Sequence, residues 1–160
     1  MTALYGRLNL HQTGSNNNPP LEDVCHLIEQ SIEEAPLEIR FTIVERFADY
    51  EGMVERNPMA GVEIHADNST TPLNISDYSE RSFRKITEKE PWRFNIVGTT
   101  DSEGVANVKF NRKNLPKGFI FYDRGNKKAS FKYMTLREFM SQSTGSYNKR
   151  QLRLGLLIKR

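Results

Sequence analysis

Positively charged side chains that stand among aromatic ones are the feature of this sequence best suited to binding chemistry. The cations that we expect to contact a nucleic acid or an acidic partner are Arg81, Arg84, Lys85, Lys89, Lys127, Lys128, Lys149 and Arg150. Cations bind phosphates and aromatic rings stack on bases, so the pattern is typical of a nucleic-acid surface. The pattern also arises where strands turn charges outward and rings inward. For that reason we expect Trp92, Phe94 and Phe131 to be core residues.

Catalytic and metal-binding motifs do not occur in the sequence. The three histidines are His11, His26 and His65, and only His65-Ala-Asp67 places a second ligand type at a recognised metal spacing, which is a common chance pairing. There is neither a Gly-x-Ser-x-Gly elbow nor a glycine-rich phosphate loop. The single cysteine, Cys25, excludes an intramolecular disulfide. We therefore predict a non-enzyme with no catalytic residues, no metal, no cofactor and no small-molecule substrate.

The net charge of +3 is the remainder of two unlike halves. Residues 1–80 hold four Arg and no Lys against fourteen Asp or Glu, a balance of −10. Residues 81–160 hold nineteen Lys or Arg against six acidic residues, a balance of +13. Such asymmetry is compatible with nucleic-acid binding, with neutralisation inside one domain, or with an acidic face stacking head to tail on a basic one. The sequence leaves these three interpretations open.

Targeting and membrane signals are also missing. The longest apolar run is only Leu156-Leu-Ile158, and the first residues lack a positive segment followed by an apolar stretch. We expect no membrane partner. We expect the protein in the cytoplasm, or in a particle assembled after cytoplasmic synthesis.

Hydrophobic periodicity divides the chain at residue 36. Residues 1–36 predict a short strand, a linker rich in Asn and Pro, and an amphipathic helix. Residues 37–160 change to a period of two, which predicts seven short strands over 39–43, 62–66, 92–96, 106–110, 119–122, 129–133 and 152–158. A polar insertion at 67–91 contains helix-start signals, and Thr135 with Glu138 forms a capping box for a helix over 136–142. The fold class is therefore mainly β: a seven-stranded sandwich with an N-terminal strand–helix extension and one or two short inserted helices.

Three stretches resemble transthyretin-like sandwiches, which include carboxypeptidase regulatory-like domains and Cna protein B-type repeats. Residues 57–65 resemble their "proline, small residue, Gly-Val" strand opening, 98–110 their T-D-x-x-G hairpin, and 115–122 their L-P-x-G-x-Y approach. In both turns we expect a glycine, Gly104 and Gly118, to supply a positive φ. The resemblance spans roughly residues 37–133. The first lysine is Lys85, which argues against the isopeptide-forming members, and the missing terminal Tyr-Arg-Gly-Ser motif argues against hydroxyisourate hydrolysis.

The strands at the two ends of the chain suggest assembly. We expect them to pair with each other or to supply edges to a neighbouring subunit, through Leu4, Leu8, Leu10, Leu152, Leu154 and Leu156. The resemblance implies a non-enzymatic structural or adaptor protein of a macromolecular assembly, such as a phage tail or a contractile secretion component. Its partner would be another protein or a second copy of the chain. The alternative is a nucleic-acid-binding regulator that uses the basic half.

Overall fold

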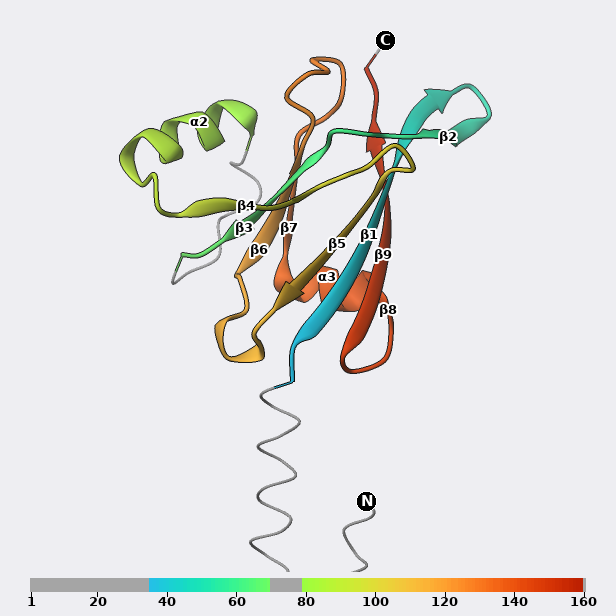
Figure 1. Ribbon diagram of the computed structural model, residues 1–160. Helices are drawn as coiled ribbons and strands as arrows, with labels where there is room; N and C mark the ends of the chain where they lie inside the picture. The colour runs from blue at the N-terminus through green and yellow to red at the C-terminus, as the bar shows by residue number, and fades with distance from the viewer. Residues whose placement is uncertain (1–34, 70–78, 160) are drawn as a thin grey trace, which may run out of the picture.

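Two β-sheets packed face to face form the body of the protein (Figure 1). The computed structural model describes residues 35–69 and 79–159. Sheet A contains β1 (Leu37–Asp49), β2 (Gly52–Pro58), β5 (Val105–Phe110), β8 (Thr144–Gly145) and β9 (Lys149–Leu157). Sheet B contains β3 (Glu63–Asp67), β4 (Phe94–Thr99), β6 (Gly118–Tyr122) and β7 (Lys132–Thr135). The described structure also contains two α-helices and one short 3-10 helix: α2 (Glu80–Lys89), α3 (Leu136–Gln142) and η3 (Arg112–Asn114). The predicted mainly β class with short inserted helices is confirmed.

Strand β1 organises sheet A because it pairs with three other strands. Its first half pairs antiparallel with β5, from Leu37 opposite Phe110 onward, and its second half pairs with β2. Its other edge pairs in parallel with β9, from Glu38 opposite Lys149 to Arg46 opposite Leu157. The first and last strands of the described sandwich therefore lie side by side, and this pairing closes sheet A within one chain.

The core between the sheets comes from the alternating apolar positions that the sequence shows. Phe41 of β1 has its ring centroid 5.4 Å from that of Phe119 and 5.5 Å from that of Phe121 on sheet B. Phe139 of α3 closes the end of this cluster, 5.8 Å from Phe41. The capping box predicted for α3 is present, since Thr135 and Glu138 exchange both capping hydrogen bonds.

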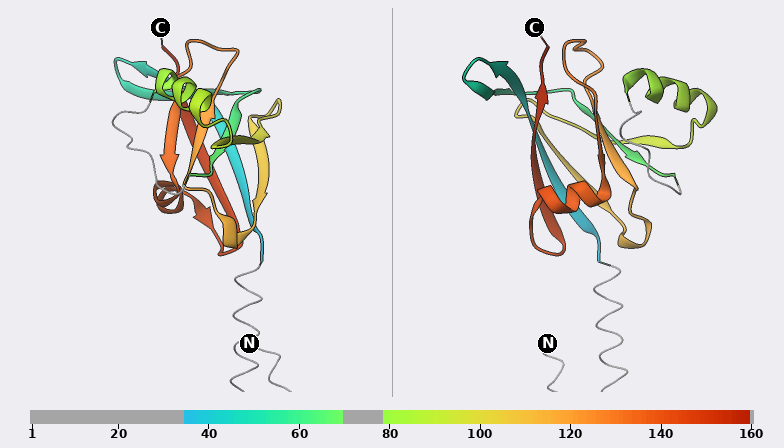
Figure 2. Two further views of the ribbon diagram at one scale, coloured as in Figure 1. Left: turned by 90° about the vertical axis from the view of Figure 1, so that its left-hand side faces the viewer. Right: turned by 180° about the vertical axis from the view of Figure 1, so that it is seen from behind.

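A second apolar cluster lies on the opposite face of sheet B. Helix α2 covers this face (Figure 2), and its Phe83 packs against Phe94, Tyr122 and Phe131 with ring centroids 5.2 to 6.0 Å apart. Ser79 is the N-cap of this helix, and its hydroxyl accepts a hydrogen bond from the backbone amide of Ser82. The polar insertion predicted at 67–91 therefore contributes a packed layer to the fold.

The strand prediction needs several corrections. The described residues hold nine strands rather than seven, because β2 and β8 were not predicted. Trp92 is 64% exposed and precedes β4, so its assignment to the core is wrong. Phe94 and Phe131 do pack, but in the outer cluster under α2. Gly104 has the expected positive φ of 75°, whereas Gly118 does not.

The three predicted assembly leucines of β9 belong to the core, whereas Leu157 at the end of the strand is exposed. Leu152 and Leu156 are buried and Leu154 packs against them, so their side chains do not face a neighbouring subunit. Strand β9 lies between β1 and β8, although β8 pairs only with Arg150 and Gln151. Leu4, Leu8 and Leu10, with the rest of the predicted N-terminal strand and helix, lie outside the described residues.

Gly118 is required for a steric reason, which gives a first prediction. A Cβ at this position would lie 2.6 Å from Cζ of Tyr133 and 2.8 Å from the backbone oxygen of Met134. We expect Gly118→Ala to lower the free energy of unfolding by about 1–3 kcal/mol, since the backbone oxygen cannot move aside. Urea unfolding would measure it. Gly125→Ala is the matched control, because its nearest contact would be Asp123 at 3.8 Å. Equal midpoints for the two variants would contradict the prediction.

Candidate anion-binding cleft

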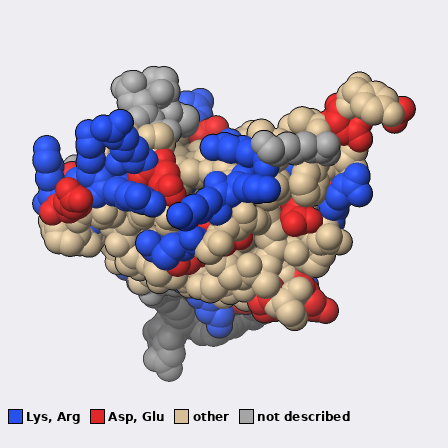
Figure 3. Space-filling view, turned by 90° about the horizontal axis from the view of Figure 1, so that it is seen from above, with Lys and Arg blue, Asp and Glu red and all other residues tan. Residues whose placement is uncertain are grey.

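A cleft of about 660 Å³ separates the first turns of α2 from the loop that follows β6. We call it the basic cleft. Its charged lining consists of five cations and two carboxylates: Arg81, Arg84, Arg124, Lys127, Lys159, Glu80 and Asp123. Tyr122, Ala129 and Phe131 form its less polar wall. Seen from above, Lys and Arg side chains gather over this part of the molecule (Figure 3).

Backbone hydrogen bonds hold the loop side of the cleft. Within the loop, the amides of Asn126 and Ala129 donate to Asp123 and Asn126. The loop is also tied to the end of sheet A, since Lys159 donates its amide to Lys128 and Ser130 donates to Leu157. These bonds bring Lys159, which lies more than thirty positions after Lys128 in the sequence, to the rim of the cleft formed by the loop.

Two of the five cations are paired with carboxylates, Arg124 with one on β3 and Arg84 with one on its own helix. Arg124 donates to both carboxylate oxygens of Glu63, at 3.1 and 3.0 Å, and this pairing raises the pKa of the guanidinium. Arg84 lies 3.5 Å from Glu80 one helical turn away, and Tyr122 and Glu80 together raise its pKa. No ion pair joins Arg81, Lys127 or Lys159 to a carboxylate within residues 35–69 and 79–159. These three side chains are therefore available to an incoming anion.

Beneath the cleft, strand β3 buries a row of polar side chains under α2. Glu63 accepts from Arg124 and lies 2.9 Å from Nε2 of His65, and the Arg124 interaction holds the pKa of Glu63 below its usual range. His65 is 5% exposed, and burial lowers its pKa although Glu63 opposes the effect. Next along the row, fully buried Asp67 accepts from the hydroxyl of Tyr133 at 3.0 Å and from Arg93 at 3.3 Å.

This row was missed in the sequence, where His65 is predicted only as an outward-facing strand residue. His65 does face away from the core between the sheets, but α2 covers it and its ring lies 5.3 Å from that of Phe83. The period-two spacing of Glu63, His65 and Asp67 was the signal that all three share one face of a strand. Nothing in the sequence shows that a helix covers that face.

The structure divides the eight predicted contact residues between the two ends of the molecule. Arg81, Arg84 and Lys127 line the basic cleft. Lys85 and Lys89 are exposed on α2 and Lys128 is exposed on the loop, so these three extend the same region. Lys149 and Arg150 begin β9 at the opposite end of the sandwich (Figure 1). Six of the eight therefore lie around the basic cleft, and Lys149 and Arg150 lie apart from them.

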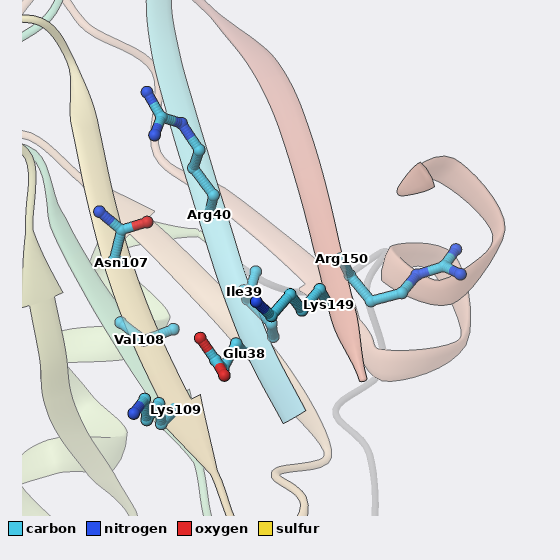
Figure 4. A pocket seen from close by; sticks show the side chains of 8 residues that line it. All are labelled: Glu38, Ile39, Arg40, Asn107, Val108, Lys109, Lys149 and Arg150. Atoms are coloured by element: carbon cyan, nitrogen blue, oxygen red, sulfur yellow. The ribbon is translucent and has the colours of Figure 1, made fainter. Parts of the chain in front are cut away.

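Arg150 has a structural role. Its guanidinium donates to the hydroxyl and the carbonyl of Ser143 at 3.0 and 2.8 Å, and to the carbonyls of Gly145 and Met140 at 3.2 and 3.3 Å. It therefore satisfies carbonyl groups at the end of α3, which a helix leaves without partners. Figure 4 shows the side chain pointing away from the neighbouring hollow and toward α3.

That hollow is a second, smaller concave surface of about 350 Å³ on the outer face of sheet A. Arg40, Lys109 and Lys149 surround Glu38 at its rim (Figure 4). Because its cations come from three flat neighbouring strands, it has no wall comparable to α2. Its cations make it a charge-matched reference surface for the basic cleft.

Comparison of the chain with family models, with curated proteins and with solved structures returned no match. The transthyretin-like resemblance therefore remains a prediction. Within the described ranges, no three His, Cys, Asp or Glu side chains stand close enough together to hold a metal ion. None of the helices described is long and apolar enough to cross a membrane.

Burial of His65 predicts a pH-dependent stability. Its pKa in the folded protein lies below the ordinary value of 6.5, so the unfolded chain binds more protons as the pH falls below 6.5. We therefore expect the free energy of unfolding to be highest above pH 6.5 and to fall on acidification. Urea midpoints at pH 7.5 and 5.5 would measure the fall, and it should be smaller in His65→Gln. Protonation of Glu63 lowers the free energy of unfolding further, but only below its ordinary pKa of 4.5, because its pKa in the folded protein lies lower still. An equal fall in both proteins would contradict this assignment.

The hydrogen bonds of Arg150 predict that lysine cannot replace it. Lysine carries a single ammonium and cannot reach carbonyl groups in several directions, so we expect Arg150→Lys to cost about 1.5–3 kcal/mol of stability. Lys149→Ala, at the exposed neighbouring position, should stay within about 0.5 kcal/mol of the parent. Thermal or urea unfolding of both variants is the measurement. A neutral Arg150→Lys would show that these bonds contribute little.

Proposed function

We propose that this chain is a non-enzymatic adaptor or structural protein of a macromolecular assembly, and that its basic cleft binds an acidic segment of a protein. The observation that carries the proposal is the cleft itself, a concave surface whose cations Arg81, Lys127 and Lys159 lack carboxylate partners among the described residues. A narrow segment bearing carboxylates fits such a surface. We place the protein in the cytoplasm, or in a particle assembled there.

The aromatic residues of the cleft favour a protein partner over a nucleic acid. Single-stranded nucleic acids bind best where rings are open for stacking. Tyr122 is only 6% exposed, and Phe131 packs against it and against Phe83. In addition, Glu80 and Asp123 interrupt the positive field along which a phosphate backbone would run. An acidic segment with spaced carboxylates tolerates both features.

A nucleic-acid-binding regulator remains the second candidate function. Residues 35–69 and 79–159 contain 21 Lys or Arg and 14 Asp or Glu, a balance of +7. Trp92 is 64% exposed just after the basic end of α2, where Lys85 and Lys89 are also exposed. An open ring beside cations is a stacking site in principle.

Fluorescence anisotropy with a labelled oligoglutamate peptide and with labelled DNA oligonucleotides would test the proposal. We expect Arg81→Glu with Lys127→Glu to weaken binding of the peptide at least about tenfold, because reversing two charges makes the cleft repel it. The matched control is Lys109→Glu with Lys149→Glu, which reverses the same charge at the second hollow. It should bind as the parent does.

Two outcomes would contradict the proposal. An equal loss in the cleft variant and the control would show that the peptide responds only to overall charge. DNA binding tighter than peptide binding, with a steep salt dependence, would favour the regulator instead. In that case Trp92→Ser should weaken the binding of single-stranded DNA.

A further inference from the structure

The β1–β2 hairpin extends beyond the sandwich as a two-stranded ribbon. Pairing between β1 and β9 ends at Arg46, after which β1 pairs only with β2, from Phe47 opposite Val54 to Asp49 opposite Gly52. The ribbon stands out at the upper end of the molecule (Figure 1). Three residues in extended conformation, 47–49, correspond to about 10 Å. The ribbon is anchored at its base, where Arg153 donates to Glu55 at 3.0 Å and Arg56 lies over the ring of Phe47.

The tip of this ribbon combines an exposed ring with negative charge. Its sequence is Asp49-Tyr50-Glu51-Gly52, and Tyr50 is 99% exposed. The amide of Glu51 donates to the Asp49 carboxylate at 2.9 Å, which stiffens the turn. No carboxylate–cation pair involves Glu51 in the part of the chain that the structure describes. A two-stranded ribbon alone is marginally stable in water, so a contact that covers the bare ring would stabilise the tip.

The tip and the basic cleft lie on opposite sides of the same end of the molecule. Seen from above, the basic side chains gather on the side of α2, and a protrusion with acidic side chains extends from the far side (Figure 3). The ribbon continues β1 beyond sheet A on the side away from α2, so it does not cross this end of the molecule (Figure 1). The tip of one chain can therefore reach only the cleft of another chain.

We infer that the acidic segment bound by the basic cleft is the Asp49–Gly52 tip of a second copy of this chain. This inference rests on the proposed function of the cleft. In the contact, Glu51 pairs with cations of the cleft such as Arg81 and Lys127, and the ring of Tyr50 lies along the less polar wall of the cleft. Because donor and acceptor surfaces differ, the contact is head to tail and leaves one tip and one cleft open in every dimer.

The expected strength of the contact follows from its size. The cleft, at about 660 Å³, has room for only the few residues of a hairpin tip. Such a contact buries far less accessible surface than the about 800 Å² per partner of a standard stable interface. We therefore expect weak association that is strongest at low salt and is screened as salt is added. Sedimentation velocity of the full chain over a wide concentration range would detect it as a rising weight-average mass.

Two monomeric variants provide the decisive experiment. Tyr50→Ser with Glu51→Gln disables the tip, and Arg81→Glu with Lys127→Glu disables the cleft, so each should lower the association constant at least about tenfold. Mixing them leaves one working tip and one working cleft in every pair. We expect the mixture to form a 1:1 dimer that does not grow further, whereas the parent forms longer species.

Matched controls separate this contact from general effects of charge and exposure. Glu103→Gln with Tyr147→Ser removes an exposed carboxylate and an exposed ring elsewhere, and Lys109→Glu with Lys149→Glu reverses two distant cations. Both should assemble like the parent. Circular dichroism and urea midpoints confirm that each variant is folded before its mass is compared.

The outcomes distinguish this inference from the proposed function. A parent chain that is a strict monomer at low salt, but binds the oligoglutamate peptide through the cleft, would overturn the inference and leave the function standing. Assembly that survives loss of the tip but not loss of the cleft would assign the cleft to another acidic segment, such as residues 21–34, and also overturn it. Failure of both assembly and peptide binding would overturn both proposals.

Discussion

The packing of β1 against sheet B is the interaction on which the rest of this structure depends. Phe41, at the middle of the strand, contacts rings of β6 and α3 at once, so one strand joins both sheets and the closing helix. The same strand pairs with β5, β2 and β9 along its two edges. Because it is thirteen residues long, it spans the sandwich and still projects beyond it. The core and the exposed hairpin are thus two ends of one rigid element.

The outer face of sheet B shows how the cleft is built. A helix could cover this face only if the polar row of β3 found partners, since unsatisfied polar groups under a helix are costly. Glu63 and Asp67 each have an arginine, and Asp67 also has the hydroxyl of Tyr133. With the row satisfied, Phe83 can dock and α2 becomes one wall of the cleft. The rim cation Arg124 is therefore also part of the support beneath the helix.

Local patterns predicted much of this fold, and long-range packing accounts for what they missed. Alternation of apolar and polar residues located the strands around Phe41, Ile64, Val108 and Phe119, and the capping box located α3. Each of these signals depends only on residues a few positions apart in the sequence. Strand β2 was missed since its exposed residues do not alternate in hydrophobicity. The role of Arg150 and the arrival of Lys159 beside the loop depend on contacts between distant segments, which composition does not encode. Half-chain charges of −10 and +13 are compatible with a contact between unlike faces, as one of three interpretations, but do not show where such faces lie.

The fold now gives that asymmetry a physical form. The acidic half of the described chain contributes the ribbon of β1 and β2, and the basic half contributes α2, the loop after β6 and the end of β9. Both surfaces belong to one sandwich whose two sheets share a continuous core. In the head-to-tail contact inferred above, the angle between tip and cleft would decide whether the chains close into a ring or continue as a filament. A packed sandwich would suit the proposed assembly role, because it would limit the range of that angle.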